Sequence, residues 1–370
     1  MGDLPMKVTR AAAGALAAAA VLYPLSQAAM ASPSSTDATA SASSDRPLRE
    51  LGDRVGLRIG TAVDMTALAN DATYRDRIAT EFSSVTPENV MKWQVVEPTR
   101  GRLDFAAADE LVRTARSHHQ EVRGHTLVWH NQLPTWLIAG VADGTITPTE
   151  LRQILRQHIL DEVAHFKGKI YQWDVANEVI DDTGNLRNSI WLANLGPGYI
   201  ADAFRWAHQA DPDAKLFIND YNIEGISAKS DAYYALVQQL RAAHVPIQGI
   251  GIQGHLGVQY GFYPASAVAE NLRRFEDLGL QTAVTEADVR MIMPPDATKL
   301  QAQAQGYSTL MQGCLLARHC TSFTVWGFTD KYSWVPSTFD GQGAANLLDE
   351  NFAAKPAYEA VRSDLAVTAH

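Results

Sequence analysis

Cysteine and metal-binding motifs are scarce in this chain. Its 370 residues include only two cysteines, Cys314 and Cys320, so a paired C-x-x-C zinc site is excluded. No H-E-x-x-H sequence occurs either, and that motif is how a helix offers two histidines to a catalytic zinc ion. We therefore expect no metal at the functional site.

Positive charge is also in short supply. The chain has 31 Lys and Arg against 41 Asp and Glu, a net charge of −10, and no basic run. Because nucleic-acid binding requires clustered cations that neutralise phosphates, we expect no nucleic-acid partner. A composition of 46% hydrophobic and 19% charged residues is typical of a water-soluble globular protein. The acidic balance suits a neutral, polyhydroxylated ligand without identifying one.

An uncharged apolar stretch, residues 11–25, lies near the N-terminus behind two basic residues, Lys7 and Arg10. The sequence Ala-Met-Ala at 29–31 then supplies small residues at the spacing of a cleavage site. This pattern predicts a signal peptide over residues 1–31 and a secreted, extracellular protein. After cleavage we expect no membrane association.

Two other interpretations of the apolar stretch are a membrane anchor and an alanine-rich helix. Pro24 and the modest hydrophobicity of alanine disfavour a stable span of ~20 residues. Residues 32–46 are almost all Ser, Thr, Ala, Pro and Asp, too polar to bury a core, and predict a disordered linker. We expect residues 47–366 to form one catalytic domain, with a monomer as the default state.

Export also bears on the two cysteines, because disulfides persist in oxidising compartments. We expect Cys314 and Cys320 to form a disulfide, and the alternative is a pair of buried thiols. The loop between them is short, so the stabilisation should lie at the low end of ~2–4 kcal/mol.

From Val55 onward, short apolar or β-branched runs alternate with longer amphipathic stretches. This alternation predicts parallel strands joined by helical crossovers. Eight such units in one domain favour a closed (β/α)₈ TIM barrel of the α/β class over an open sheet. The expected strands are 55–63, 82–86, 122–129, 170–178, 215–222, 247–256, 281–288 and 322–330.

Polar and aromatic residues recur where these strands end. In a barrel the carboxyl ends of the strands surround one mouth, where catalytic groups lie. Each such residue alone is explained as a capping group or a buried polar residue, but a coincident set on seven strands indicates an active site. The set comprises Glu88, Asn89, His125, Trp129, Asn177, Glu178, Asp220, Tyr221, Gln253, His255, Glu286, Asp288 and Trp326.

One motif points elsewhere. Gly249, Gly251 and Gly254 spell G-x-G-x-x-G, and Glu270 follows at about the distance of a ribose-binding acid. The dinucleotide fingerprint requires a helix to begin within the glycines, whereas an aromatic, proline-bearing segment follows here. Glu270 also belongs to a helical pattern of its own. We therefore expect no nucleotide and no other cofactor.

Two glutamates stand out among the strand-end residues. Glu178 ends the fourth expected strand within WDVANEV, and Glu286 ends the seventh within VTEADVR. Strands four and seven face each other across the mouth of a barrel, so the two carboxyl groups can bracket a sugar ring. Cleavage of a glycosidic bond needs such a pair around an oxocarbenium-like transition state.

With these two glutamates and the segments around them, the chain closely resembles the glycoside hydrolase family 10 xylanases. The matching segments run from Gly60 to about Pro336, and HTLVWHNQLP together with TVWGFTDKYSW is far more specific than the Asn-Glu pair. The resemblance implies a retaining endo-1,4-β-xylanase that acts on xylan and xylo-oligosaccharides by double displacement. Another β-glycanase of the same clan, such as an endoglucanase or mannanase, is one alternative. A non-catalytic carbohydrate-binding barrel is the other.

The resemblance also implies a role for each matching residue. Glu178 would be the acid/base and Glu286 the nucleophile, with Asn177 on the sugar 2-hydroxyl and with His255 and Asp288 orienting Glu286. Substrate contacts would come from Glu88, Asn89, Lys92, His125, Trp129, Gln132, Tyr221, Gln253, Trp326 and Trp334. One departure is Ala287, where similar sequences commonly carry a larger apolar residue such as Leu.

Overall fold

The computed structural model describes residues 46–368. The predicted signal peptide lies outside the described residues, and so does the predicted linker apart from Arg46. The described part begins with helix α2 (Leu48–Arg54) and ends with helix α15 (Pro356–Thr368). Within it, no helix is both long and apolar enough to cross a membrane.

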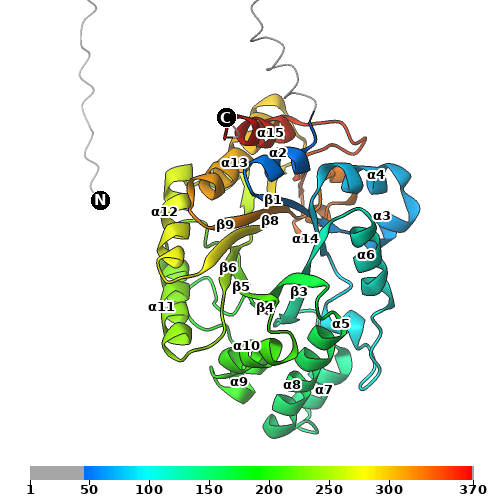
Figure 1. Cartoon of the computed structure of the whole chain (residues 1–370), viewed down its shortest axis with the longest axis vertical. Helices are drawn as coiled ribbons and strands as arrows, with labels where there is room; N and C mark the ends of the chain where they lie inside the picture. The colour runs from blue at the N-terminus through cyan, green and yellow to red at the C-terminus, as the bar shows by residue number, and fades with distance from the viewer. Residues whose placement is uncertain (1–45, 369–370) are drawn as a thin grey trace, which may run out of the picture. The chain divides into compact units, whose positions relative to one another are not determined.

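Within residues 46–368, eight parallel strands close into a barrel. Each strand pairs with its neighbour, and β9 pairs with both β8 and β1 to complete the ring (Figure 1). The (β/α)₈ prediction is confirmed. The strands are β1 (Arg58–Val63), β2 (Ser84–Pro87), β3 (Glu121–Val128), β4 (Ile170–Asn177), β5 (Lys215–Asp220), β6 (Gly249–Ile252), β8 (Gln281–Ile292) and β9 (Cys320–Val325).

Helices surround the barrel, and most of them bury one face against it, while α9 and α15 pack on neighbouring helices (Figure 1). In α6 the buried residues Ala108, Leu111, Val112 and Ala115 recur at helical spacing. The helices are α3 (Met65–Asn70), α4 (Ala72–Glu81), α5 (Trp93–Val96), α6 (Ala106–Ser117), α7 (Thr135–Ala142), α8 (Pro148–His165), α9 (Ile190–Leu195), α10 (Tyr199–Ala210), α11 (Ala228–Ala242), α12 (Ala265–Glu276), α13 (Ala297–Leu316) and α14 (Val335–Thr338), with 3₁₀ turns η1 (Val258–Tyr260) and η2 (Asp330–Tyr332).

The expected strand 247–256 is in fact two strands. β6 ends at Ile252, and β7 (His255–Gly257) begins after a break at Gly254, whose φ of +79° favours glycine. Gly251 serves packing, because a Cβ there would lie 2.3 Å from Oδ1 of Asn219. The glycines therefore shape the sheet, and no helix begins among them.

The seventh barrel strand is longer than expected. Beyond the barrel, β8 pairs with β7 in parallel and with β10 (Gln342–Gly343) in antiparallel fashion, so it continues to Ile292. The expectation that Glu286 ends this strand is therefore wrong. Glu286 lies where β8 leaves the barrel, and the extension above it positions Asp288.

The predicted disulfide is present. Cys314 in α13 and Cys320 at the start of β9 are bonded. The bond closes the connection between the helix and the strand, on the outside of the barrel and away from the residues discussed next.

Candidate active site

A cleft of about 700 Å³ lies at the mouth of the barrel. Every predicted site residue lines this cleft except Asp288 and Asp220. Asp288 is fully buried beside His255, and Asp220 is fully buried beneath the cleft, where it accepts hydrogen bonds from Lys229 and Tyr233. The structure thus brings together side chains that lie up to about 250 positions apart in the chain. The cleft has further lining residues that the sequence analysis missed, namely Asn131, Asn222, Arg290, Ser337, Thr338 and Phe339.

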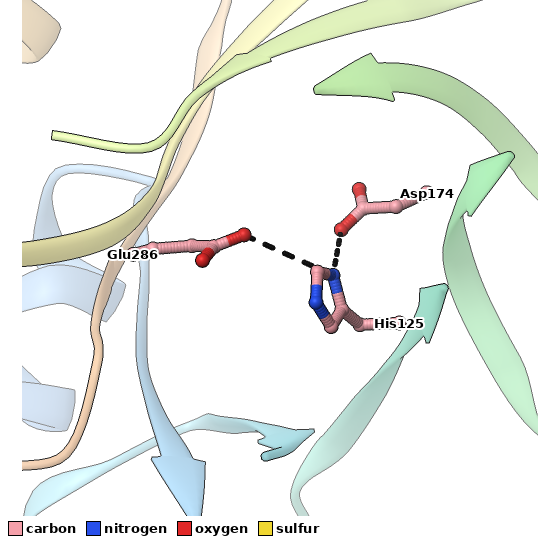
Figure 2. A group of neighbouring side chains, drawn as sticks. All are labelled: His125, Asp174 and Glu286. Atoms are coloured by element: carbon pink, nitrogen blue, oxygen red, sulfur yellow. Dashed lines mark hydrogen bonds and ion pairs between the residues drawn. The ribbon is translucent and has the colours of Figure 1, made fainter. Parts of the chain in front are cut away.

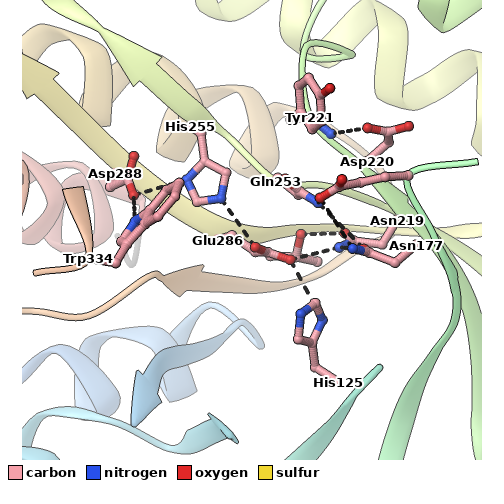
Figure 3. A network of polar contacts seen from close by, with 12 residues as sticks. His125, Asn177, Asn219, Asp220, Tyr221, Gln253, His255, Glu286, Asp288 and Trp334 are labelled. Carbon is pink, nitrogen blue, oxygen red and sulfur yellow. Dashed lines mark hydrogen bonds and ion pairs between the residues drawn. The ribbon is translucent and has the colours of Figure 1, made fainter. Parts of the chain in front are cut away.

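Glu286 lies at the centre of a polar network (Figure 3). Asn219 donates to its Oε1 over 2.8 Å, and His255 Nε2 lies 3.2 Å from its Oε2. Burial alone would raise the pKa of this carboxyl. Electrostatic interaction with His125, the hydrogen bond and charge of His255, and the charge of Arg123 outweigh burial and lower the pKa to about 2. Glu286 is therefore a buried anion over the whole physiological pH range.

His255 connects Glu286 to Asp288. Its Nδ1 lies 3.0 Å from Oδ2 of Asp288, and the same oxygen accepts a hydrogen bond from the indole of Trp334 over 2.8 Å. Burial lowers the pKa of His255, but the charge and hydrogen bond of Asp288, with those of Glu286, raise it to about 10. A charged imidazolium therefore sits between two carboxylates.

A second polar group, formed by the buried residues His125 and Asp174, lies next to Glu286 (Figure 2). His125 Nδ1 is 2.8 Å from Oδ2 of Asp174, and ligand atoms of His125, Asp174 and Glu286 lie within 4.8 Å of one another. Such a cluster has the donor set of a cation site. However, the buried guanidinium of Arg123 pairs with Asp174 and lies 3.6 Å from Glu286. Arg123 already supplies the positive charge that a metal ion would bring, so we assign no metal here.

Glu178 has a different environment from Glu286. Its side chain is 13% exposed in the cleft, and its Oε1 accepts hydrogen bonds from Gln253 at 3.1 Å and Asn177 at 3.3 Å. Asn177 Oδ1 in turn accepts from Asn219, which also donates to Glu286. These amides connect the two carboxyl groups across the mouth.

The backbone at Glu178 is strained. Its φ is +57°, in the left-handed region, directly after the last residue of β4. For a residue other than glycine this conformation costs on the order of 1–3 kcal/mol and needs support from its surroundings. Part of that support is the hydrogen bond from Glu178 N to the carbonyl of Asn219, 2.8 Å long.

The side of the cleft formed by the segments after β2 and β3 is rich in hydrogen-bonding groups. Lys92 donates to Asn89 over 3.1 Å and lies over the ring of Trp129, while Gln132 also approaches Asn89 at 3.4 Å. Burial, together with the charge of Asp64, raises the pKa of Glu88 to about 7, against the lowering effect of Lys92. This wall offers donors and acceptors suited to sugar hydroxyls.

The comparison with protein families agrees with this arrangement. The model named Glycosyl hydrolase family 10 matches residues 47–364. The chain belongs to this family. The endo-1,4-beta-xylanase of Agaricus bisporus is 43% identical over 85% of the chain and 93% of its own length. Endo-1,4-beta-xylanase B of Thermotoga neapolitana is 42% identical over 86% of the chain and 92% of its own length.

Solved structures of family 10 also superpose on the chain. Xylanase 10B of Thermotoga petrophila in complex with xylobiose aligns with a TM-score of 0.84 and 40% identity, covering 88% of this chain and 99% of that one. A xylotetraose complex of the intracellular xylanase TsXylA from Thermoanaerobacterium saccharolyticum aligns with a TM-score of 0.78 and 38% identity, covering 86% and 98%.

Three residues of this family 10 site escaped the sequence analysis, which concentrated on strand ends. Arg123, Asp174 and Asn219 are fully buried within β3, β4 and β5. A signal for two of them was present, because a charged residue inside an apolar strand is rarely buried unless it is paired. Arg123 and Asp174 are such a pair.

Proposed function

We propose that this family 10 chain is a retaining endo-1,4-β-xylanase in which Glu286 is the nucleophile and Glu178 the acid/base. The observation that carries the proposal is the contrast between the two carboxyl groups. Glu286 is buried and surrounded by His255, His125 and Arg123, so it is held ionised. Glu178 faces the cleft, where it can exchange a proton with a leaving group or water.

The first step forms a bond between Glu286 and the anomeric carbon. The glycosidic C–O bond breaks as Glu178 transfers its proton to the departing oxygen. Asn177, beside Glu178, would hydrogen-bond the sugar 2-hydroxyl, an interaction that strengthens in the transition state. His255, held by Asp288, keeps Glu286 oriented and ionised before attack.

The second step releases the sugar. Glu178, now a carboxylate, takes a proton from water as the water oxygen attacks the anomeric carbon. The ester bond to Glu286 breaks, which restores both glutamates and retains the β configuration.

Relatives and cleft composition together support xylan as the substrate. The quoted relatives are named endo-1,4-beta-xylanases, and the quoted complexes hold xylobiose and xylotetraose. In this chain Glu88, Asn89 and Lys92 line one side of the cleft, with the indoles of Trp326 and Trp334 on another. The ionised state of Glu286 argues against a barrel that only binds carbohydrate, because such a barrel has no need of an ionised nucleophile.

Activity on two kinds of substrate tests the proposal. The wild type should release reducing sugar from xylan, and ¹H NMR should show the β-anomer as the first product. Glu286→Ala should abolish hydrolysis of every substrate. Glu178→Ala should lose xylan hydrolysis but keep kcat/KM on an aryl xylobioside with a good leaving group, since such a group needs little acid assistance. Equal activity of both variants on the aryl substrate would refute the separate roles.

We also propose that the protein is exported. The basic and apolar N-terminal pattern supports a signal peptide, and the Cys314–Cys320 disulfide suits an oxidising compartment. N-terminal sequencing of the protein from culture medium should give a start near residue 32, and retention of the full chain inside cells would contradict export.

A further inference from the structure

Arg187 lies in the loop between β4 and α9, half-buried beside the cleft and outside every residue set discussed above. The loop folds back on itself: Arg187 N donates to Val179 O over 2.8 Å, and Ile180 forms an antiparallel bridge with Leu186. This turn brings the guanidinium against the backbone of Glu178.

The guanidinium of Arg187 bonds to three acceptors at once. Its Nε donates to the carbonyl of Glu178 over 2.7 Å, and its Nη2 donates to the carbonyl of Ile180 over 3.1 Å. The same Nη2 donates to the hydroxyl of Tyr221, a cleft residue, over 2.9 Å. A planar, forked donor with a fixed charge is suited to hold several oxygens in one geometry.

The other polar groups of this backbone segment are also held. Val179 N donates to the hydroxyl of Tyr233, which donates to buried Asp220, and Lys229 donates to the same carboxylate over 2.9 Å. The left-handed residue Glu178 therefore lies in a segment fixed from both sides. Arg187 is the one side chain in this set that binds the carbonyl of Glu178 itself.

We propose that Arg187 is a positioning residue for the acid/base, holding Glu178 in the left-handed backbone conformation that directs its carboxyl group to the leaving-group oxygen. Arg187 acts through the main chain and contacts no reacting atom. The inference rests on the proposed role of Glu178 and adds the group that fixes its geometry. Without the clamp, Glu178 relaxes toward an unstrained conformation and its carboxyl group moves away from the glycosidic oxygen.

The test is the dependence of kcat/KM on the leaving group, because this constant reports the first, acid-assisted step. Arg187→Met keeps the length of the stem and removes all three bonds. We expect kcat/KM on unactivated xylotriose to fall by at least ~10-fold, within the ~10²–10⁴-fold that general acid catalysis supplies. On dinitrophenyl xylobioside, which needs no acid, the fall should stay below about 3-fold.

Three further variants separate the possible causes. Arg113→Met is the matched control, since Arg113 is 69% exposed on α6 and, among residues 46–368, forms an ion pair only with Glu110. Both rates should be unchanged. Arg187→Lys is included in case the methionine variant does not fold. Lysine can bind only one acceptor at a time, so kcat/KM should again fall more on xylotriose than on dinitrophenyl xylobioside, but by a smaller factor. Tyr221→Phe leaves both carbonyl bonds of Arg187 intact and should not create that selectivity.

Equal losses on the two substrates in both Arg187 variants would overturn the inference, because they would indicate a general structural role. The same selectivity in Tyr221→Phe would overturn it too, because Arg187 would then act through the tyrosine. Glu178→Ala distinguishes the two proposals. If it is selective and Arg187→Met is not, only the positioning role fails. If Glu178→Ala itself shows no selectivity, the acid/base assignment fails.

Discussion

The indole Nε1–H of Trp334 donates to Oδ2 of Asp288 over 2.8 Å, and the same oxygen contacts Nδ1 of His255 at 3.0 Å. A single buried carboxylate thus holds both a wall of the cleft and the imidazolium beside Glu286 (Figure 3). The position of the Trp334 indole and the charge environment of Glu286 therefore both depend on the Asp288 carboxylate.

Trp334→Phe should show how much the hydrogen bond from Trp334 to Asp288 contributes to the free energy of unfolding. Phenylalanine keeps an aromatic ring but cannot donate to Asp288, and a hydrogen bond to a charged group contributes about 1.5–3 kcal/mol. We expect the free energy of unfolding, measured by urea denaturation, to fall by about that amount. Trp326→Phe is the control. Trp326 is the more buried indole, at 6% exposure, so a larger loss there would show that packing, and not the bond to Asp288, dominates.

Acid should remove the stabilisation that ionised Glu286 provides. Its pKa falls from 4.5 to about 2 on folding, so the contribution is present above pH 4.5 and is lost as pH drops toward 2. At 1.36 kcal/mol per pKa unit, its size is on the order of 3 kcal/mol. The difference in unfolding free energy between the wild type and Glu286→Gln should grow from pH 2 to pH 5. A difference that does not change over this range would contradict the ionised state.

Alkali should act in the opposite sense through His255. Its pKa rises from 6.5 to about 10 on folding, despite burial, because of Asp288 and Glu286. Its stabilisation is therefore complete below pH 6.5 and is lost as pH rises toward 10. The stability advantage of the wild type over His255→Gln should shrink across that interval. An advantage that is constant from pH 6 to 10 would mean that His255 is neutral in the folded protein.

The sequence predicted the features that depend on local patterns, namely the order of the strands and the residues at their ends. Strand order and the clustering of strand-end residues at one mouth follow from periodicity and from barrel geometry. Glu178 and Glu286 were therefore placed together although 108 positions separate them in the sequence. Family resemblance added the roles.

Features that depend on distant pairing were not predicted. The extension of β8 exists because β7 and β10 pair with it, and the sequence of residues 281–292 contains no pattern that predicts these two pairings. The three bonds of Arg187 depend on how the loop after β4 folds back, which no periodicity records. The hydrogen bond from Trp334 to Asp288 joins residues predicted for separate roles.

Discrimination between xylan and cellulose should depend on the two indole walls of the cleft. Both polymers have β-1,4 linkages, but xylose lacks the hydroxymethyl group at C5. Trp326 packs edge-on against His125 at 5.1 Å between ring centres, and Trp334 lies 5.0 Å from His255. Both indoles are thus backed by packed rings and cannot move without disturbing the network around Glu286. Glu88, Asn89 and Lys92 would meanwhile bind hydroxyls that the two sugars share.

We therefore expect a steric basis for specificity, in which the extra hydroxymethyl group of glucose meets an indole. Overpacking of this kind costs ~1–3 kcal/mol, which corresponds to roughly 10- to 100-fold in kcat/KM. Trp326→Ala or Trp334→Ala should narrow the ratio of activities on matched aryl xylobioside and cellobioside, even while lowering both rates. An unchanged ratio in both variants would place the discrimination elsewhere in the cleft. A wild-type enzyme that prefers the cellobioside would instead favour the endoglucanase alternative, because the walls would then accept the larger sugar.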